Sequence, residues 1–414
     1  MKRFFGLFLL VAFLTTAANA QLMKMGVKPD ERSGGMARVE AMGGGNNFLV
    51  DPTNMLTNPA YAAAYYNFLW GDVGSQAGSP SDGNGQFAGF NFWMSKQLTL
   101  GVVLSRNDYA GPGISNVSLG NTLVSALNNA GAPLNAIALD NNFQVLAAFS
   151  PSSTTTLGLG LAFASSKHEN VTAAGTDKAS ASQLGVNLGV LHNFSTEMAL
   201  DLGVAFVMGS ATSESGATKN EETGTAIAAK ARMFFGLNNN LTFVPVAMFE
   251  TVSGTSKQGA TSRDRNSHMN FGVGAGLNYL AGKSILLTGG IELMMTSEKQ
   301  AAVAGTSPEL TDSRFIFPAW VLGAEWYVLD WLKARIGYRA ASYSNTMESA
   351  ATATTKNEMT MTGYDRTGMT LGVGFKFGSF NLDATINDEI LREGFNLIGG
   401  GKQTFAHISA SYAF

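Results

Sequence analysis

The chain has 414 residues, of which 14% are charged and 45% are hydrophobic, and its formal net charge is -3. Soluble domains carry about 25% charged residues, so this composition argues against an ordinary soluble enzyme. The near-neutral charge gives no basis for nucleic-acid binding. A chain without cysteine has no disulfide, no thiolate metal site and no cysteine nucleophile.

Residues 1–20 have the features of a secretory signal peptide. A basic pair is followed by an apolar stretch over residues 4–14 and by a small-x-small cleavage box that ends at Ala20. A membrane anchor is the alternative, but the apolar run is shorter than the ~20 residues that a spanning helix needs. We therefore expect export, and a mature chain that begins at Gln21.

The stretch 21–63 lacks regular alternation and is rich in glycine and proline. Its Asp51-Pro52 and Asn58-Pro59 pairs favour a turn or extended backbone and stop a helix. The stretch also fits the pattern A-x-x-x-x-M-G-G followed by D-x-x-x-x-x-x-N-P-A. The pattern is met by Ala37, Met42, Gly43, Gly44, Asp51, Asn58, Pro59 and Ala60.

This pattern resembles the start of the FadL-like family of outer-membrane proteins, which includes hydrophobic-compound transporters and the PorV-type barrels of type IX secretion. The resemblance implies that residues 21–63 form a hatch, or plug, inside a barrel. The family's usual N-P-A-G continues here with Tyr61, a departure that bears on a fatty-acid role rather than on the fold. The expected hatch residues are Gly43, Gly44, Gly45, Asp51, Asn58 and Pro59.

Residues 64–414 read as short alternating segments whose connectors are alternately tight and long. The link Gly378-Ser379 is tight, whereas the stretches 214–223 and 346–366 are long and polar. Short periplasmic turns and longer outer loops are typical of transmembrane β-barrels. The sequence therefore predicts an all-β fold, a transmembrane antiparallel β-barrel of about 14–16 strands with the hatch inside its lumen.

The predicted strands have one apolar and one small face. Over residues 270–279, Phe271, Val273 and Leu277 alternate with glycine and asparagine. Period two then places the apolar set toward lipid and the small set toward the lumen. The inward glycines either make room for the N-terminal segment or only let the sheet coil. They are Gly158, Gly160, Gly185, Gly189, Gly203, Gly272, Gly274, Gly276, Gly337, Gly372 and Gly374.

Charged residues also fall on the inward face. Charges in a low-dielectric lumen should be paired, so an ion-pair network that braces barrel and hatch is one reading. A path for a polar substrate is the other. The expected lumen charges are Lys230, Arg232, Glu292, Glu325, Lys333, Arg335, Arg339 and Lys376.

Aromatic residues near predicted strand ends, including Trp70, Trp326 and Trp331, are typical of the belts at membrane interfaces. The last segment alternates and stops on an aromatic pair, Tyr412 and Phe414. Such an ending resembles the assembly signal of outer-membrane barrels, which implies the barrel-assembly machinery as a partner.

Three features interrupt the regular pattern. Pro245 and Pro318 lie inside predicted strands, where proline removes a ladder hydrogen bond. Each should mark a wall kink, either a lateral opening of the kind found in FadL-like transporters or a simple bulge. The stretch 116–139 has a helical apolar pattern and should cap the outer mouth or pack on the loop rim.

The sequence contains no recognisable catalytic grouping. The four histidines are scattered and none has the spacing of a zinc helix. We expect no enzymatic activity, cofactor or metal, and a location in the outer membrane of a Gram-negative-type bacterium, among its lipids. Passive uptake of hydrophobic small molecules is the first functional hypothesis. The alternatives are a PorV-type barrel that docks partner proteins through its outer loops, and a general porin.

Overall fold

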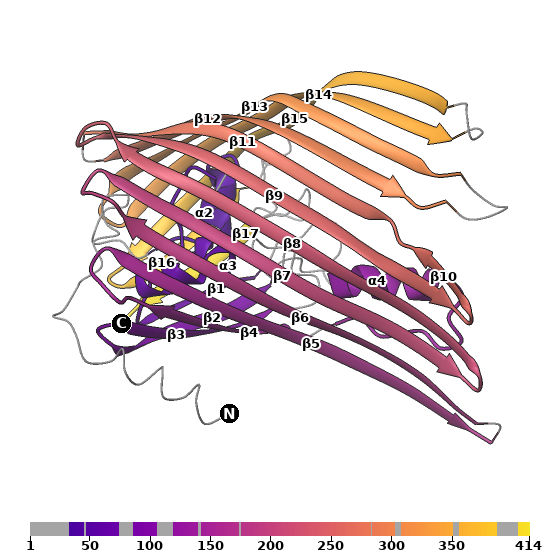
Figure 1. The fold of residues 1–414 in the computed structure, drawn as a ribbon. Helices are drawn as coiled ribbons and strands as arrows, with labels where there is room; N and C mark the ends of the chain where they lie inside the picture. Colours follow the sequence, from indigo (N-terminus) through magenta and orange to yellow (C-terminus); the bar gives the residue numbers. More distant parts are fainter. Residues whose placement is uncertain are drawn as a thin grey trace, which may run out of the picture.

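The protein is an antiparallel β-barrel (Figure 1). The computed structural model describes residues 33–44, 47–73, 86–105, 119–139, 142–173, 175–282, 284–302, 308–350, 356–386 and 405–414. The expected signal peptide and Gly45 lie outside these residues.

The wall is built from strands that follow one another in chain order. They are β1 (Phe68–Asp72), β2 (Phe87–Ser95), β3 (Leu98–Ser105), β4 (Asn142–Phe149), β5 (Thr155–Thr172), β6 (Gly175–Asn193), β7 (Met198–Ser215), β8 (Thr218–Gly236), β9 (Leu241–Gln258), β10 (Thr261–Asp264), β11 (Ser267–Ala281), β12 (Ile285–Gln300), β13 (Leu310–Leu329), β14 (Leu332–Ala350), β15 (Lys356–Phe377), β16 (Phe380–Ile386) and β17 (Phe405–Ala413). The helices are α2 (Met36–Ala41), α3 (Asn54–Thr57), the 3-10 helix η2 (Pro59–Ala63) and α4 (Leu119–Asn129).

The barrel is closed by its first strand. β1 pairs with β2 on one side and with β17 on the other, so the sheet has no free edge. Both β10 and β11 pair with β9 and together form one position in the wall. The 17 described strands therefore make sixteen wall positions. The predicted fold class is confirmed, with the strand number at the upper end of the expected range.

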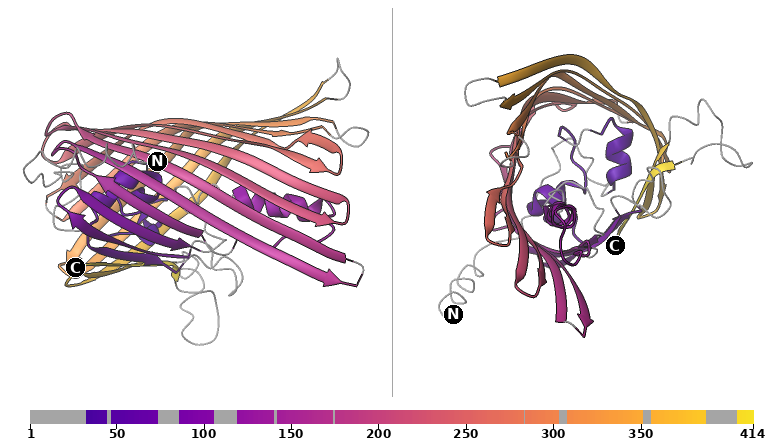
Figure 2. Two further views of the ribbon diagram at one scale, coloured as in Figure 1. Left: turned by 60° about the horizontal axis from the view of Figure 1, so that its bottom comes forward. Right: turned by 90° about the vertical axis from the view of Figure 1, so that its right-hand side faces the viewer.

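The barrel is taller on one side than on the other. β5–β9 and β11–β15 contain 15–22 residues each, whereas β1–β4, β16 and β17 contain 5–9. The left view of Figure 2 shows the long strands reaching well past the short ones. A membrane-spanning strand needs roughly 9–11 residues. The long strands therefore continue beyond the bilayer.

The outward face of the long strands changes from apolar to hydroxyl-bearing along its length. On β7, Val204, Phe206 and Met208 are exposed outward, and Ser210 and Thr212 follow on the same face. A lipid-facing band has to be apolar, so this change marks its outer edge. The same change runs from Phe163 to Ser165 on β5, from Ile227 to Thr225 on β8 and from Phe249 to Thr251 on β9.

Strand pairing continues past this edge into water. β7 and β8 stay paired as far as Ser215 and Thr218. The prediction of a long loop over 214–223 is therefore wrong, and β14 and β15 likewise pair through most of 346–366. Backbone hydrogen bonds sustain a ladder whether or not its side chains are apolar. A strand wetted on its outer face thus loses the alternation that identifies it in sequence.

Residues 33–44 and 47–67, called here the N-terminal segment, lie inside the barrel. The right view of Figure 2 shows its indigo helix within the ring of strands. Its buried side chains, among them Phe48, Met55 and Leu56, form the main hydrophobic cluster with inward residues of the wall. None of the described helices is long and apolar enough to cross a membrane.

Helix α4 lies on the inner face of the tall side. Leu119, Leu123 and Leu127 are buried against small residues of β5–β8. A Cβ atom at Gly224 of β8 would lie 2.9 Å from Leu119 Cδ1, so glycine allows the helix to approach. The expected positions for this stretch were a cap over the outer mouth and packing on the loop rim. The structure shows its helix packed along the inner face of the extended strands.

The aromatic belt was predicted correctly only in part. Trp93, Trp326 and Trp331 face outward beside turns, with exposed fractions of 45–50%. Trp70 is 2% exposed and packs edge-on against Phe87 inside the barrel, so its assignment to the belt is wrong. Because β1 has only five residues, its alternation does not show from sequence which of its side chains point inward.

The position of the membrane edge on β7 can be tested by chemical labelling, because the chain has no native cysteine. We expect a membrane-impermeant maleimide to label Thr212→Cys in intact cells and to leave Phe206→Cys unlabelled, since lipid covers Phe206. Equal labelling of the two variants would contradict the proposed boundary. Detergent-solubilised protein, in which both sites react, serves as the control.

Candidate functional site

The N-terminal segment is seated on inward glycines of the wall. A Cβ atom at Gly158 of β5 would lie 2.1 Å from the Ala60 nitrogen, and one at Gly203 of β7 would lie 2.4 Å from the Thr57 oxygen. A Cβ atom at Gly189 of β6 would collide with the Asn58 side chain. These glycines are therefore positions of close backbone approach, the first of the two readings.

The opposite side of the segment is seated in the same way. The Phe48 ring lies over a glycine of β11 and a glycine of β12, where added Cβ atoms would lie 2.4 and 2.2 Å away. Across the barrel, a Cβ at Gly337 would lie 2.1 Å from the Gly43 nitrogen, and one at Gly372 would lie 2.4 Å from the Ala41 Cβ. Glycines thus border the segment on at least two sides.

Arg38 of α2 joins the segment to the wall through buried ion pairs. Its Nε donates to Glu325 Oε2 at 2.9 Å, and its Nη1 donates to Asp51 Oδ2 at 3.1 Å. Glu325 also accepts from Arg335 Nε at 2.6 Å, and Arg335 Nη2 lies 2.7 Å from Asp383 Oδ1. Burial raises the pKa of the Asp51 carboxyl, although Arg38 acts in the opposite direction.

A second buried group lies at the other end of the segment. Arg232 of β8, 1% exposed, donates its Nε to Asp201 Oδ2 at 2.7 Å and its Nη1 to the Leu49 carbonyl at 2.7 Å. Asp201 also accepts from Asn58 Nδ2 at 2.6 Å and from the Tyr61 hydroxyl at 2.9 Å. The carboxylate of Asp201 thus links two strands to the segment.

Three inward asparagines complete the attachment and were missed as site residues. Each lies on the small face of its strand, the only sequence signal that could have found it. Each donates its side-chain Nδ2 to a backbone carbonyl of the segment: Asn91 to Tyr65 at 2.9 Å, Asn187 to Leu56 at 2.9 Å and Asn278 to Phe48 at 2.7 Å. These bonds satisfy carbonyls that would otherwise be buried without partners.

The remaining predicted residues lie as follows. Glu292 accepts from Asn47 Nδ2 at 2.5 Å, and Lys333 Nζ lies 4.8 Å from the Tyr327 ring centre. A Cβ atom at Gly44 would lie 3.3 Å from Arg339 Nη1. Of the expected lumen charges, Lys230 and Lys376 also lie on the inward faces of their strands, and Pro59 packs beside Gly160 and Gly189. The rings of Tyr412 and Phe414 stack with centres 6.2 Å apart and are exposed.

The two strand prolines behave differently. At Pro318, the pairing of β13 with β14 shifts register between Ile316 and Ala319, and the pairing with β12 shifts close by. At Pro245, the register with β11 is continuous, and the pairing with β8 resumes in the same register beyond the proline. Pro318 therefore marks a bulge in the wall, and Pro245 does not shift the register.

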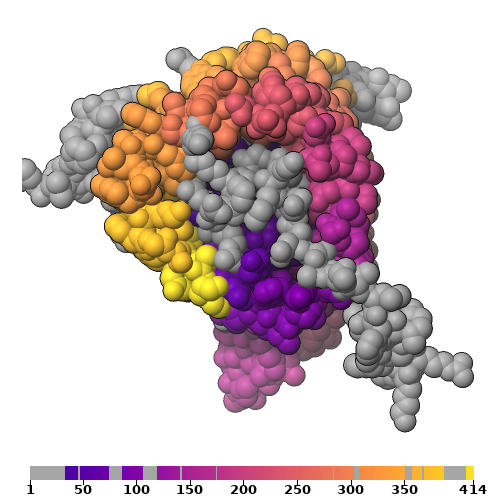
Figure 3. All heavy atoms as spheres, turned by 90° about the vertical axis from the view of Figure 1, so that its left-hand side faces the viewer, coloured from indigo at the N-terminus to yellow at the C-terminus, as the bar shows by residue number. Residues whose placement is uncertain are grey.

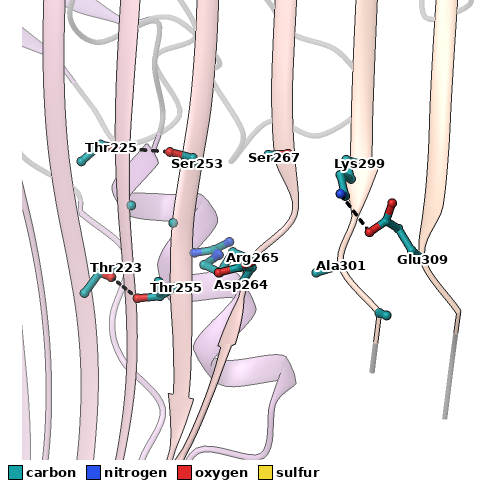
Figure 4. Close-up of a pocket in the computed structure, with 13 residues that line it drawn as sticks. Thr223, Thr225, Ser253, Thr255, Asp264, Arg265, Ser267, Lys299, Ala301 and Glu309 are labelled. Carbon is teal, nitrogen blue, oxygen red and sulfur yellow. Dashed lines mark hydrogen bonds and ion pairs between the residues drawn. The ribbon is translucent and has the colours of Figure 1, made fainter. Parts of the chain in front are cut away.

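An open pocket lies at the outer rim, between β10 and the end of β12 (Figure 4). Thr223 and Thr255 form a hydrogen bond of 2.8 Å at one end, and Lys299 pairs with Glu309 at 2.9 Å at the other. Its other lining residues are hydroxyl-bearing, charged or small, and none of them has a large apolar side chain.

No group of three or more side chains that could hold a metal ion occurs among the described residues. In the space-filling view of Figure 3, indigo atoms of the N-terminal segment are visible inside the ring of wall strands. The site is a segment attached to the wall by charge pairs, hydrogen bonds and close packing.

Removing one member of a buried charge pair should destabilise this attachment. We expect Asp201→Asn to lower the free energy of unfolding by about 3–5 kcal/mol, because Arg232 is left buried without its counter-charge. Urea unfolding of the folded protein in lipid measures the change. Lys299→Gln, which breaks an exposed pair, is the matched control and should have little effect. Equal losses in the two variants would contradict the role of Asp201.

A side chain added beneath the segment should displace it. We expect Gly158→Val to raise ion conductance in planar bilayers well above that of the unchanged protein, because the valine occupies the space of Ala60. Gly289→Ala is the control, since its Cβ faces outward toward the flexible Leu322 side chain, 3.0 Å away. Unchanged conductance in Gly158→Val, with folding verified by heat-dependent gel mobility, would sink this prediction.

Comparison with known proteins gives matches to structures only. No family model and no curated protein matches the sequence. Similar solved structures include the Pseudomonas putida toluene transporter TodX, 11% identical over 92% of this chain and 98% of that chain, with a TM-score of 0.38. A TodX mutant monoaromatic hydrocarbon channel is 11% identical over 92% and 99%, with a TM-score of 0.40.

The copper transporter OprC is also similar, at 10% identity and a TM-score of 0.38. The match covers 77% of this chain, which spans only 60% of the length of OprC. The neighbours thus include hydrocarbon channels and a copper transporter. Likeness at this level adds no detail beyond the fold. The strand pairing and the apolar outer face identify the fold independently: the chain is an outer-membrane β-barrel.

Proposed function

We propose that the protein takes up small hydrophobic molecules across the outer membrane, with the N-terminal segment as the hatch. In this proposal, residues 21–63 are the hatch and residues 64–414 the barrel. A ligand enters from the outer mouth, reaches the inner wall above the hatch and leaves sideways into the bilayer. Diffusion down a gradient supplies the driving force.

The observation that carries this proposal is an apolar row on the inner wall that ends at the wall bulge. Met248, Met294 and Ile316 face inward in one cross-strand row, because strand pairing connects them through Gly272. Ile316 adjoins the register shift at Pro318. In this proposal, an apolar surface that leads to the wall bulge gives a hydrophobic molecule a lateral exit. Pro245 lacks such a shift and is the weaker candidate for the exit.

A general porin fits the inner wall less well. Porins keep a water-filled bore, whereas this lumen holds a segment attached through Arg38, Asn58 and Asp201. The expected lumen charges that contact the segment thereby support bracing of barrel and hatch rather than a polar substrate path. Release or local shift of the hatch would be needed before solutes could pass.

Docking of a partner protein is the second candidate function. The long strands carry a polar outer surface beyond the bilayer edge, for example at Ser180 and Thr212, whose hydroxyls lie 2.9 Å apart. A protruding rigid wall of this kind is suited to a protein contact. If docking is the function, shortening the β5–β6 hairpin should abolish partner binding and leave uptake of small molecules unchanged.

The C-terminal strand supports a proposal about assembly. The rings of Tyr412 and Phe414 face outward and stack at the end of β17. This strand pairs with both β1 and β16. We infer that the barrel-assembly machinery recognises this strand before the barrel closes. Outer-membrane lipids then surround the apolar band.

Blocking the apolar row should stop uptake. We expect Ile316→Trp to reduce uptake of a labelled lipophile at least tenfold in asymmetric vesicles with lipopolysaccharide in the outer leaflet, because the indole fills the route to Pro318. Phe315→Trp, the outward neighbour on the same strand, is the matched control and should keep normal uptake. Normal uptake by a correctly folded Ile316→Trp variant would defeat the proposal.

A further inference from the structure

A continuous polar row crosses the inner wall one step above the apolar row, on the outer side. Cross-strand pairing places Glu250 beside Asn270, Asn270 beside Thr296, Thr296 beside Arg314 and Arg314 beside Asn345. The alternation of each strand turns these side chains inward, since their neighbours Phe249, Met269, Met295 and Phe315 are exposed on the outer face. Five consecutive positions in the wall thus carry polar side chains along one cross-strand row.

Several polar atoms of this row are buried and have no hydrogen-bond partner among the described residues. They are Asn270 Oδ1, Arg314 Nε and Asn345 Oδ1, together with Asp312 Oδ1 on the next row outward. Buried polar atoms without partners are uncommon and costly. Two of the three atoms in the row, and Asp312 Oδ1 in the next row, are oxygens that accept hydrogen bonds, so this part of the wall lacks donors more than acceptors.

The charge of the surroundings points the same way. Arg314 is the one cation within the row, and its Nη2 already lies 3.3 Å from Asp365 Oδ2. Its guanidinium also stacks over the Tyr343 ring, 4.2 Å from the ring centre. The carboxylates of Glu250 and Asp312 face the same space. Lys230 adjoins Met248 in the apolar row, so the carboxylates of Glu250, Asp312 and Asp365 are set against two cations, Arg314 and Lys230. A ligand carboxylate would meet more negative than positive charge, whereas a hydroxyl group would supply the missing donors.

The distance between the rows sets the size of the ligand. Along each strand the polar row lies two positions from the apolar row, a distance of ~6.6 Å. One aromatic ring or a short alkyl chain spans this distance. A molecule with an apolar body on Met248, Met294 and Ile316 would therefore place a polar head at the height of Asn270 and Arg314.

We propose that the polar row binds the hydroxyl head of an uncharged amphipathic ligand, so that the transported molecule is an alcohol or phenol rather than a carboxylate or a bare hydrocarbon. This inference rests on the proposed uptake function for its biological meaning. The binding site itself is defined by the inner wall of β9 and β11–β14.

Equilibrium binding of three matched probes to the full chain in lipid nanodiscs tests this inference. Toluene, benzyl alcohol and benzoate share a ring and differ in the head group, and empty nanodiscs correct for partition into lipid. We expect benzyl alcohol to bind roughly tenfold more tightly than toluene, because one or two hydrogen bonds are gained. Benzoate should bind more weakly than either.

The double variant Asn270→Leu/Asn345→Leu should reduce binding of benzyl alcohol to the level of toluene and leave toluene unchanged. Thr296→Val, a smaller change, should give a partial loss even if the double variant does not fold. Ser297→Ala, on the outer face next to Thr296, is the control and should bind like the unchanged protein. Tightest binding by benzoate, or an alcohol preference that survives in both inner-wall variants, would overturn the inference.

Binding and passage are measured separately. If the alcohol preference is found but Ile316→Trp does not reduce uptake, the uptake function fails and the binding site stands. If uptake depends on Ile316 but the three probes show no preference, the uptake function stands and the polar row is not a ligand site.

Discussion

Every backbone N–H and C=O group in the lipid-exposed wall must be hydrogen-bonded, and closure of the barrel by β1 meets this requirement. A sheet with a free edge would leave a row of unpaired groups in hydrocarbon. The five residues of β1 remove both edges by pairing with β2 and β17. Because β1 directly follows the N-terminal segment, the strand that closes the wall also fixes the point at which this segment enters the lumen.

The interior depends on a combination of small residues and buried charge. Glycines of β5, β7 and β14 allow the backbone of the N-terminal segment to approach the wall more closely than any side chain would permit. Arg38 and Arg232 then fix the segment, because each guanidinium is held by wall or segment carboxylates in water-poor surroundings. Such pairs add little net stability compared with apolar packing, but they favour one arrangement strongly, since any shift leaves a charge unpaired.

The inner wall above the segment has two layers of different chemistry. The row of Met248, Met294 and Ile316 is apolar and ends at the Pro318 bulge, and the next row outward is polar. The order from outside to inside is thus hydrogen-bonding groups, apolar surface, wall bulge and attached segment. In the proposed function, this order would orient an amphipathic molecule on arrival and direct its apolar part toward the bulge.

The sequence determined the features that depend on local patterning. Alternation over 270–279 fixes which side chains meet lipid, the tight link Gly378-Ser379 fixes a hairpin, and the motif from Ala37 to Ala60 marks the segment inside the barrel. These signals are short-range, because period two and turn chemistry are properties of neighbouring residues.

Tertiary structure alone decided the rest. The continuation of β7 and β8 into water left no apolar alternation to detect, and the burial of Trp70 followed from closure of the ring. The partners of Arg38 are separated from it by 13 and 287 positions, and the polar row joins residues of five strands. Such contacts arise from strand register and barrel shear, which set the height of each residue around the wall and leave no trace in any one strand.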